Sequence, residues 1–469
     1  MLCLKKVKPS PEQLKILSRS NSGPEVLRGA AGSGKTTTAI IRLRSHIGRF
    51  IGKRQRENNY NPIKVAVFTF NRTLKGYVEQ LVSHNTPEDV PIEVTVTTHG
   101  KWAKEILGSP QIASDKVRER IIAENSRKLS KALPLEFLNS EVEYILNRFG
   151  SLGLDEYLTC HRDGRGGAPR VDRSAREEIV ELIIRPYLDS ILESGSLDWS
   201  QISERVQEMD NSLEFDIVIV DEAQDFSAVQ IKSIMRHVAH DYVVTFVLDT
   251  AQRIYARGFT WKEVGISVGP GNSFQLSRNY RNTKEIAEMA KGLIEGLPAE
   301  EDFSLPTSDV AQGSGMVPRL LNGKFSSQVQ FAIDYIQREV DLSSESVAFV
   351  HRKGGRWFDY LKSKLSQAGL DWEIMTRREC WPEGDCNIGL LTMHSSKGLE
   401  FDHVFLLGIS SDLFNDWDSD DDHRLIENRK LLAMSIGRAV KTVHLGAKRD
   451  DSSEIVGLLK EGTFELIDL

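Results

Sequence analysis

Residues that could bind a phosphate gather near the start of the chain. Gly29 is followed by four residues and then by Gly34, Lys35 and Thr36, which matches the phosphate-loop spacing G-x-x-x-x-G-K-[ST]. Glycines let the backbone curl so that N–H groups point at a phosphate, and the following helix adds positive potential. The pattern predicts that Lys35 reaches the β- and γ-phosphates of ATP and that Thr36 holds Mg²⁺. The predicted nucleotide loop comprises Gly29, Ala30, Ala31, Gly32, Ser33, Gly34, Lys35, Thr36 and Thr37.

An acidic pair follows a second apolar run. Residues 215–220 read as a buried strand, and Asp221 and Glu222 come directly after it. We expect Asp221 to bind Mg²⁺, directly or through water, and Glu222 to polarise the attacking water as the general base. An acidic helix start would look the same in isolation, but the phosphate loop upstream favours the catalytic interpretation.

Two glutamines flank these motifs. Gln13 lies on a predicted helix that begins after Ser10, and its amide can donate and accept as reading an adenine edge requires. Gln252 follows the predicted strand 242–248 and could sense the γ-phosphate. A plain surface position on a helix is the alternative for Gln13.

Aromatic residues lie near the ends of predicted strands. Phe70 ends an apolar run, and Tyr255, Phe259 and Trp261 are interleaved with arginines. Such rings could stack on the bases of a single strand. A core position is the alternative for Phe70.

The elements that would position these residues alternate between strands and helices. Short apolar runs at 25–27, 65–70, 94–99, 215–220 and 242–248 end in polar residues, as strands do where a ligand binds beyond their carboxyl ends. Residues 101–213 are mostly helical in pattern, and Pro186 is expected to kink the helix at 176–192. The basic residues between Arg42 and Arg56 are interpreted as a solvated helix face.

Composition sets the class of protein. The 469 residues are 40% hydrophobic and 27% charged, which is typical of a soluble globular chain of about three domains. The net charge of −7 means that a nucleic acid would need a local basic groove. Four cysteines have no zinc-site spacing, and neither a signal peptide nor a long apolar run is indicated. We therefore expect a cytoplasmic protein that has no contact with a membrane.

Further motifs extend this pattern through the second half of the chain. After GAAGSGKT, TFN, TTH, DEAQD and DTAQRIY come QLSRNYRN at 275–282, LTMHSSKGLEF at 391–401 and ENRKLLAMSIGRA at 427–439. In type and order these blocks resemble superfamily 1 nucleic-acid helicases of the UvrD/Rep/PcrA type. The resemblance covers almost the whole chain, from Gln13 to Arg438.

The resemblance implies an α/β fold with two RecA-like parallel-sheet domains that bind ATP between them. It places the first domain, which binds ATP, at residues 1–105 and 214–274. A helical insertion then covers 106–213, and the second domain covers 275–469. Tyr280 would stack on adenine, Glu400 would lie near the ribose, and Arg281 and Arg438 would act as arginine fingers on the γ-phosphate. Strand contacts would come from Phe70, His99, Tyr255, Trp261, Thr392 and His394.

Departures from the family pattern affect the expected activity. The family's Trp-Arg-Gly is Ala256-Arg257-Gly258 here, so Tyr255, Phe259 or Trp261 would have to replace the missing ring. The short interval from Arg281 to Thr392 leaves no room for the large accessory subdomain of longer members. Separation of duplexes is therefore less firmly implied than ATP hydrolysis.

We expect DNA-stimulated ATP hydrolysis that drives 3′-to-5′ movement on single-stranded or partly duplex DNA, with the polarity implied by resemblance alone. A nucleotide-gated sensor or loader that works with a nuclease or other effector, as in anti-phage defence, is one alternative. An RNA-directed motor is another, because nothing in the sequence separates RNA from DNA.

Overall fold

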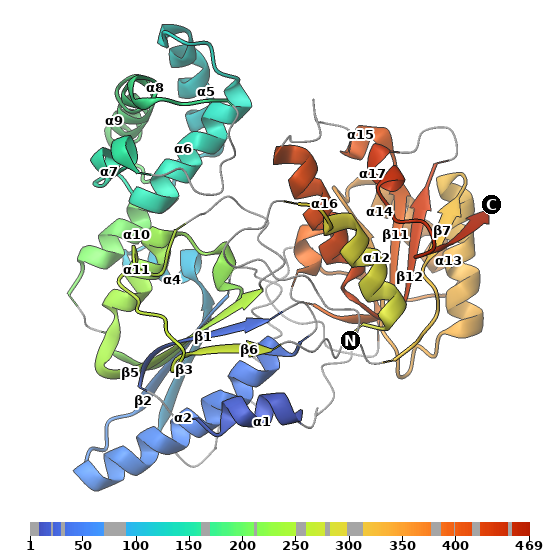
Figure 1. Cartoon of the computed structure of the whole chain (residues 1–469), viewed down its shortest axis with the longest axis horizontal. Helices are drawn as coiled ribbons and strands as arrows, with labels where there is room; N and C mark the ends of the chain where they lie inside the picture. Colours follow the sequence, from blue (N-terminus) through green and yellow to red (C-terminus); the bar gives the residue numbers. More distant parts are fainter. Residues whose placement is uncertain are drawn as a thin grey trace.

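The computed structural model describes thirteen stretches of the chain. They are residues 9–19, 22–29, 33–69, 91–160, 169–210, 213–249, 259–276, 282–297, 313–376, 386–397, 399–414, 423–448 and 453–469. Within them lie two parallel β-sheets with helices packed on their faces, and a separate group of helices above the first sheet (Figure 1). The predicted α/β fold with two parallel-sheet domains is confirmed.

The first sheet has six strands in the order β3-β2-β4-β5-β1-β6, and every pairing in it is parallel. Its central strand β4 is buried along its whole length, as its unbroken apolar run predicts. The polar residues that follow the strands therefore meet at one edge of the sheet. The strands are β1 (Gly23–Gly29), β2 (Ile63–Thr69), β3 (Ile92–Thr98), β4 (Phe215–Val220), β5 (Val238–Asp249) and β6 (Ser273–Leu276).

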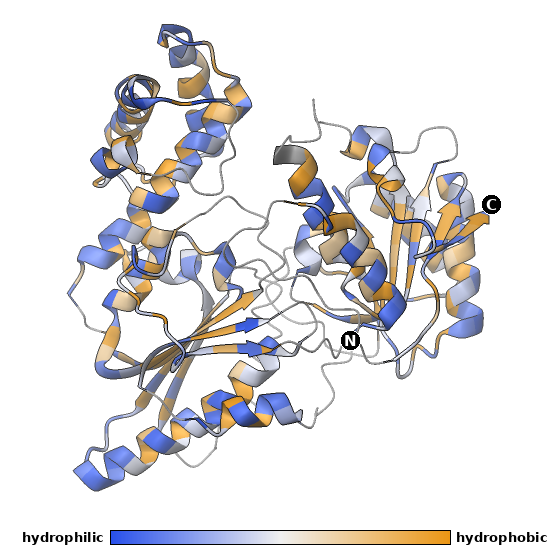
Figure 2. Cartoon of the chain, in the orientation of Figure 1, coloured by the Kyte–Doolittle hydropathy of each residue, from blue (hydrophilic) through white to orange (hydrophobic). Residues whose placement is uncertain are grey.

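Helices α1 (Pro11–Leu17) and α2 (Lys35–Glu57) lie together beside this sheet. The predicted start of α1 is confirmed, because Ser10 and Gln13 cap it reciprocally. The outer turns of α2 are hydrophilic in Figure 2, and its inner turns pack on the strands. The other helices of the first domain are α4 (His99–Ile106), α10 (Trp199–Glu208) and α11 (Ala228–Arg236).

Five helices between β3 and β4 form their own hydrophobic core: α5 (Asp115–Asn125), α6 (Leu135–Phe149), α7 (Leu154–Thr159), α8 (Arg173–Ile179) and α9 (Arg185–Glu193). The irregularity expected at Pro186 is present, because the proline lies in the first turn of α9, just after a π-helical turn at Val180–Ile184. A π-turn re-registers the backbone where a proline cannot donate. The segments that lead into and out of the group pair at an isolated bridge between Ile112 and Leu197, and Arg148 of α6 forms an ion pair with Glu263.

The second sheet has seven strands in the order β13-β7-β12-β11-β8-β10-β9, again all parallel. Its strands are β7 (Arg319–Asn322), β8 (Val347–His351), β9 (Glu373–Ile374), β10 (Ile388–Thr392), β11 (Phe401–Ile409), β12 (Ala439–Ala447) and β13 (Glu465–Asp468). Its helices are α12 (Lys284–Ile294), α13 (Phe325–Glu339), α14 (Arg356–Gln367), α15 (Ser411–Phe414), α16 (His423–Ile436) and α17 (Glu454–Gly457).

The division into domains stays a proposal, and packing departs from the expected limits at two points. Residues of α10 belong to the hydrophobic cluster of the first sheet, and β6 pairs with β1 as far as Leu276. Described residues between 313 and 376 all serve the second sheet and its helices. In none of the described ranges does a helix combine the length and apolar composition needed to cross a bilayer.

Candidate active site

The phosphate loop begins where β1 ends and finishes where α2 begins. Gly34 adopts a left-handed conformation (φ 75°, ψ 30°) at the start of α2, where a side chain would be strained. A Cβ atom at Gly34 would lie 2.6 Å from Nε2 of Gln13, and one at Gly29 would lie 2.5 Å from Oγ of Ser33. Lys35 is buried at the first position of α2. The two glycines are therefore required by close approach as well as by the motif.

Gln13 lies against this loop. Its Oε1 accepts from the Ser10 N–H at 2.8 Å, and its Nε2 donates to the carbonyl of Gly34 at 3.4 Å. The side chain is thus placed beside the loop, as the sequence suggested, and it fixes α1 to the start of α2. Its role toward adenine stays a prediction.

Two buried hydroxyl groups near the loop lack a hydrogen-bond partner in the described part of the chain. They are Oγ of Ser33 and Oγ1 of Thr69, which ends β2. A buried polar atom without a partner is costly, because it has lost water and gained nothing. The orphaned Ser33 hydroxyl, packed against Gly29, is suited to donate to an oxygen atom of a bound phosphate.

The predicted magnesium ligands, Thr36 and Asp221, lie in contact at the carboxyl ends of the strands of the first sheet. Oγ1 of Thr36 donates to the Asp221 carboxylate, at 3.1 Å from Oδ1 and 3.2 Å from Oδ2. Burial raises the pKa of Asp221, and the neighbouring Glu222 raises it further. A carboxylate in that state gains from a cation, and oxygen ligands suit Mg²⁺. Because no described group of three or more His, Cys, Asp or Glu residues could hold a metal, phosphate and water would complete such a shell.

Glu222 stands in an unusual backbone conformation. Its φ of 50° and ψ of 43° are left-handed, which is strained for a residue with a side chain. One carboxylate oxygen accepts from Nε2 of Gln224 at 2.5 Å. The turn therefore aims the carboxylate of the predicted general base, and Gln224, which the sequence analysis gave no role, restrains it.

On the second domain, Arg438 and Glu400 precede the neighbouring strands β12 and β11. Arg438 is buried, and its guanidinium donates from Nε to the carbonyl of Met434 at 3.1 Å and from Nη1 to that of Leu399 at 3.5 Å. The amide of Asn282 donates to two carbonyls beside it, those of Gly437 and Ala439. These contacts hold the predicted arginine finger in place. Its contact with a γ-phosphate stays a prediction.

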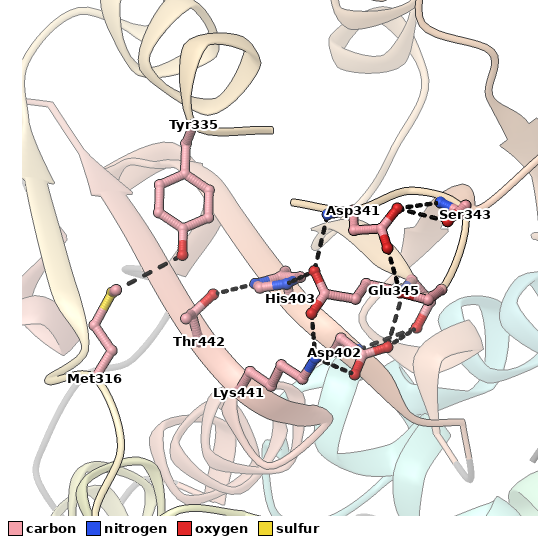
Figure 3. Close-up of polar contacts among 11 residues, drawn as sticks. Met316, Tyr335, Asp341, Ser343, Glu345, Asp402, His403, Lys441 and Thr442 are labelled. Atoms are coloured by element: carbon pink, nitrogen blue, oxygen red, sulfur yellow. Dashed lines mark hydrogen bonds and ion pairs between the residues drawn. The ribbon is translucent and has the colours of Figure 1, made fainter. Parts of the chain in front are cut away.

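A polar cluster supports the same end of the second sheet (Figure 3). Nδ1 of His403 lies 2.8 Å from Oγ1 of Thr442, and its Nε2 lies 3.3 Å from Oε2 of Glu345. Lys441 forms ion pairs with both Glu345 and Asp402. Burial alone would raise the pKa of Glu345, but Lys441 lowers it. Burial alone would lower the pKa of Lys441, but Glu345 and Asp402 raise it. The cluster fixes the starts of β8, β11 and β12, and hence the strands that carry Glu400 and Arg438.

A buried ion pair joins the two domains. Nζ of Lys397 donates to Oδ2 of Asp225, and the two side chains are 7% and 0% exposed. Both residues belong to motifs quoted above, but the sequence analysis assigned neither a role. Their separation of 172 positions in the chain gave no signal that they pair.

The residues predicted to contact a nucleic-acid strand differ in how exposed they are. Thr392 ends β10 and its hydroxyl donates to Oγ of Ser395 at 2.9 Å, while His394 is exposed in the next turn. Trp261 is partly buried, with its ring 4.9 Å from that of Phe246. These three positions leave surface for a ligand, and their roles stay predictions.

His99 does not present its ring to solvent. The imidazole is buried, its Nε2 lies 2.8 Å from Oγ of Ser233, and its ring packs edge-on against Trp102. Burial lowers the pKa of His99 to about 3, so the ring is neutral. The position of His99 therefore argues against the expected contact with a strand. At the end of β3 the ring turns inward, because α4 starts at His99 itself.

Trp199 is an exposed ring that the sequence analysis missed. It begins α10, next to α4, and its ring is 47% exposed. A Cβ atom at Gly100 would lie 3.0 Å from the ring, so the indole lies against the backbone just beyond β3. The glycine directly after a strand-end histidine was the available signal.

Arg42 corrects the interpretation of residues 42–56 as a solvated face. Its side chain is 1% exposed and donates to Glu25 of β1, from Nε at 2.8 Å and from Nη2 at 2.5 Å. The other basic residues of α2 include exposed ones, such as Arg44 and Arg56. The pair ties α2 to β1 directly behind the phosphate loop.

Several predicted site residues lie outside the described ranges. They are Ala30, Ala31, Gly32, Phe70, Gln252, Tyr255, Tyr280 and Arg281.

Comparisons with known proteins agree with this geometry. Residues 13–257 match the family model described as "AAA domain", which is just over half of the chain, and residues 374–448 match "UvrD-like helicase C-terminal domain".

Three relatives show how far the likeness extends. A "Probable DNA helicase" of Mycoplasma pneumoniae is 23% identical over 92% of this chain and 82% of its own length. A "Putative ATP-dependent DNA helicase" of Acanthamoeba polyphaga mimivirus is 24% identical over 58% of this chain and 39% of its own. The "ATP-dependent DNA helicase PcrA" of Staphylococcus aureus is 39% identical over 12% of this chain and 8% of its own.

Proposed function

Because this chain belongs to the AAA-domain family and is a superfamily 1 helicase of the UvrD/PcrA type, we propose that DNA stimulates its hydrolysis of ATP and that hydrolysis drives 3′-to-5′ movement along a single strand. The observation that carries the proposal is the meeting of Thr36 and Asp221 at 3.1 Å, directly beside Glu222. Oxygen ligands of this kind suit a Mg²⁺ ion that is shared with phosphate oxygens.

The chain's own residues divide the work of hydrolysis. Lys35 would offset charge on the β- and γ-phosphates, while Thr36 and Asp221 would hold Mg²⁺. The ion, when bound, neutralises charge that develops on the phosphate oxygens. Glu222 orients the attacking water and accepts its proton. Arg438 stabilises the transferred group from the second domain, as a guanidinium fork can.

Strand binding is proposed for the surface between the ends of β3 and β10. We assign to it Thr392, His394 and Trp261, whose side chains are exposed or partly exposed, together with the exposed ring of Trp199. Each stacked ring contributes roughly 1–3 kcal/mol whatever the base, so binding tolerates any sequence. The net charge of −7 favours a grip confined to this surface.

The proposal is tested by ATPase assays without nucleic acid, with single-stranded DNA and with single-stranded RNA. Lys35→Ala should abolish turnover, and Glu222→Gln should bind ATP but not turn it over. Lys362→Ala and Glu177→Gln, at ion pairs distant from the loop in sequence, are matched controls and should keep the parent rate.

Direction is read separately from partial duplexes with a 3′ or a 5′ tail. Displacement from the 3′-tailed duplex alone supports the proposed polarity. Stimulation by RNA but not DNA would identify an RNA-directed motor. ATP hydrolysis that moves no strand would favour the sensor or loader acting with a nuclease or effector. Hydrolysis by Glu222→Gln at the parent rate would refute the general-base assignment.

A further inference from the structure

The ion pair between Lys397 and Asp225 is the deepest described contact between charged groups of the two domains. Asp225 is fully buried and Lys397 nearly so. Two charges withdrawn from water cost several kcal/mol each unless they meet, so separating them without solvent is strongly unfavourable. The pair is therefore either formed, with the domain edges together, or broken, with both groups hydrated.

On the first domain, Asp225 lies next to Glu222, the predicted general base. Asp225 closes the short helical turn Ala223–Asp225, and its N–H donates to the carbonyl of Glu222 at 2.9 Å. Within that turn, Gln224 donates to the Glu222 carboxylate. A shift of Asp225 must therefore move the backbone and the side-chain restraint of Glu222 together.

On the second domain, Lys397 lies next to the turn that we propose binds a nucleic-acid strand. The N–H of Lys397 donates to the carbonyl of His394 at 3.3 Å, closing a turn that follows Thr392. The hydroxyl of Thr392 also accepts from the N–H of Ser395 at 3.2 Å. The turn is thus held at both ends, and its anchor residues Met393 and Leu399 are buried.

The segment between β10 and β11, which carries Lys397, runs from the carboxyl ends of the strands to their amino ends. β10 and β11 both run parallel to β8, so the end of β10 and the start of β11 lie at opposite ends of the strands. Thr392 stands at one end and Glu400 at the other, with Lys397 between them. A single short segment therefore links the strand surface, the Asp225 contact and the predicted ribose site.

We propose that the Lys397–Asp225 pair positions Glu222 in response to strand binding, so that a strand at the Thr392–His394 turn sets the general base for hydrolysis. Lys397 and Asp225 are positioning residues, because they act through Glu222. The inference rests on the proposed DNA-stimulated ATPase, and it names the contact by which the stimulation is transmitted.

The experiment compares Lys397→Met, Asp225→Asn and the double variant with the parent protein. Basal and strand-stimulated kcat, KM for ATP and melting temperature are measured for each. Each single variant should lose about tenfold or more of the stimulation ratio, with KM changed far less, and the double variant should lose no more than the singles. Lys397→Arg should regain part of the stimulation because it keeps the charge.

The control is a second Lys–Asp pair, Lys53 with Asp241, which is 2.6 Å long, about one-third exposed and on the outer side of the first domain. Lys53→Met and Asp241→Asn should keep the full stimulation ratio. Full stimulation in Lys397→Met, or independent additive losses in the two single variants, overturns the inference alone. A parent protein that no nucleic acid stimulates overturns the proposed function with it. A loss that only follows the melting temperature also overturns the inference, since it indicates a structural role.

Discussion

Replacing Arg42 with methionine should lower the free energy of unfolding by about 3–5 kcal/mol, because it leaves Glu25 as a buried carboxylate without its cation. Arg42 makes two hydrogen bonds to that carboxylate and a third to the carbonyl of Ile16, at the end of α1. Its guanidinium also lies 5.1 Å from the centre of the Phe274 ring. One side chain thus joins α1, α2, β1 and β6 behind the phosphate loop.

The size of the effect follows from what would remain around Glu25. Thr245 lies 3.5 Å and His46 3.6 Å from the carboxylate, which is too little to replace a two-pronged guanidinium. Burial alone would raise the pKa of Glu25, but His46 and Arg42 together lower it. A carboxyl with a lowered folded pKa contributes stability above its unfolded pKa and loses it as the pH falls. The full penalty should therefore be seen at pH 7.

The assay is urea unfolding at pH 7, followed by tryptophan fluorescence. The double variant Glu25→Gln, Arg42→Met removes both charges, and it should recover most of the loss, because a neutral pair of similar volume needs no counter-charge. Arg49→Met is the control on the same helix, since its ion pair with Asp241 is 4.0 Å long and partly exposed. It should cost less than about 1 kcal/mol. The reasoning would be refuted if Arg42→Met lowered the free energy of unfolding by less than about 1 kcal/mol. It would also be refuted if the double variant were no more stable than Arg42→Met alone.

Three further predictions concern activity and pH. Arg438→Ala should lower kcat by about 10³ with a smaller change in KM, as loss of an arginine finger does; a change confined to KM would mean that Arg438 only binds nucleotide. Trp199→Ala should weaken binding of single-stranded DNA by about 1–3 kcal/mol in a fluorescence titration without lowering the melting temperature, and an equal loss of stability would assign the ring to packing instead. His444 is fully buried, its ring nitrogens have no described partner, and burial lowers its pKa to about 3. Its unfolded form gains a proton below about pH 6.5, so stability should fall from that pH toward 3, and His444→Phe should flatten the decline by up to about 1.4 kcal/mol per pH unit.

Much of the architecture could be predicted because its signals are local. The apolar run at 215–220 contains no polar interruption except Asp216, and it forms the central strand β4. Ser10 as a cap and Pro11 in the first turn predicted the start of α1, where Gln13 completes a capping box in the structure. Thr36 and Asp221 were each expected to hold Mg²⁺, Thr36 from the phosphate-loop motif and Asp221 from the acidic pair after a buried strand. They meet because strand ends of one parallel sheet lie together.

The errors share a different cause, because they concern which way a polar side chain turns. Arg42 was assigned to a solvated helix face, and the family resemblance assigned His99 to a contact with nucleic acid, yet each finds a partner inside the first domain, Glu25 and Ser233 respectively. Burial of a polar group depends on a partner that can lie anywhere in the chain, and periodicity carries no information about it. Trp199 shows the reverse, since a large apolar ring at the first position of a capped helix stays half exposed.

The connection between β10 and β11 shows why a motif can be found in the sequence while its work is not. Parallel strands are usually joined by a dozen or more residues that include a helix, but only residues 393–400 separate Thr392 from Phe401. A connection that short, anchored by buried Met393 and Leu399, has little slack with which to absorb a displacement at either end. Lys397 stands within it and meets a buried carboxylate that borders the general base. The sequence displays these residues as one continuous motif, whereas their effect arises from the strand order β11-β8-β10, which sets the two ends of the segment at opposite ends of the strands.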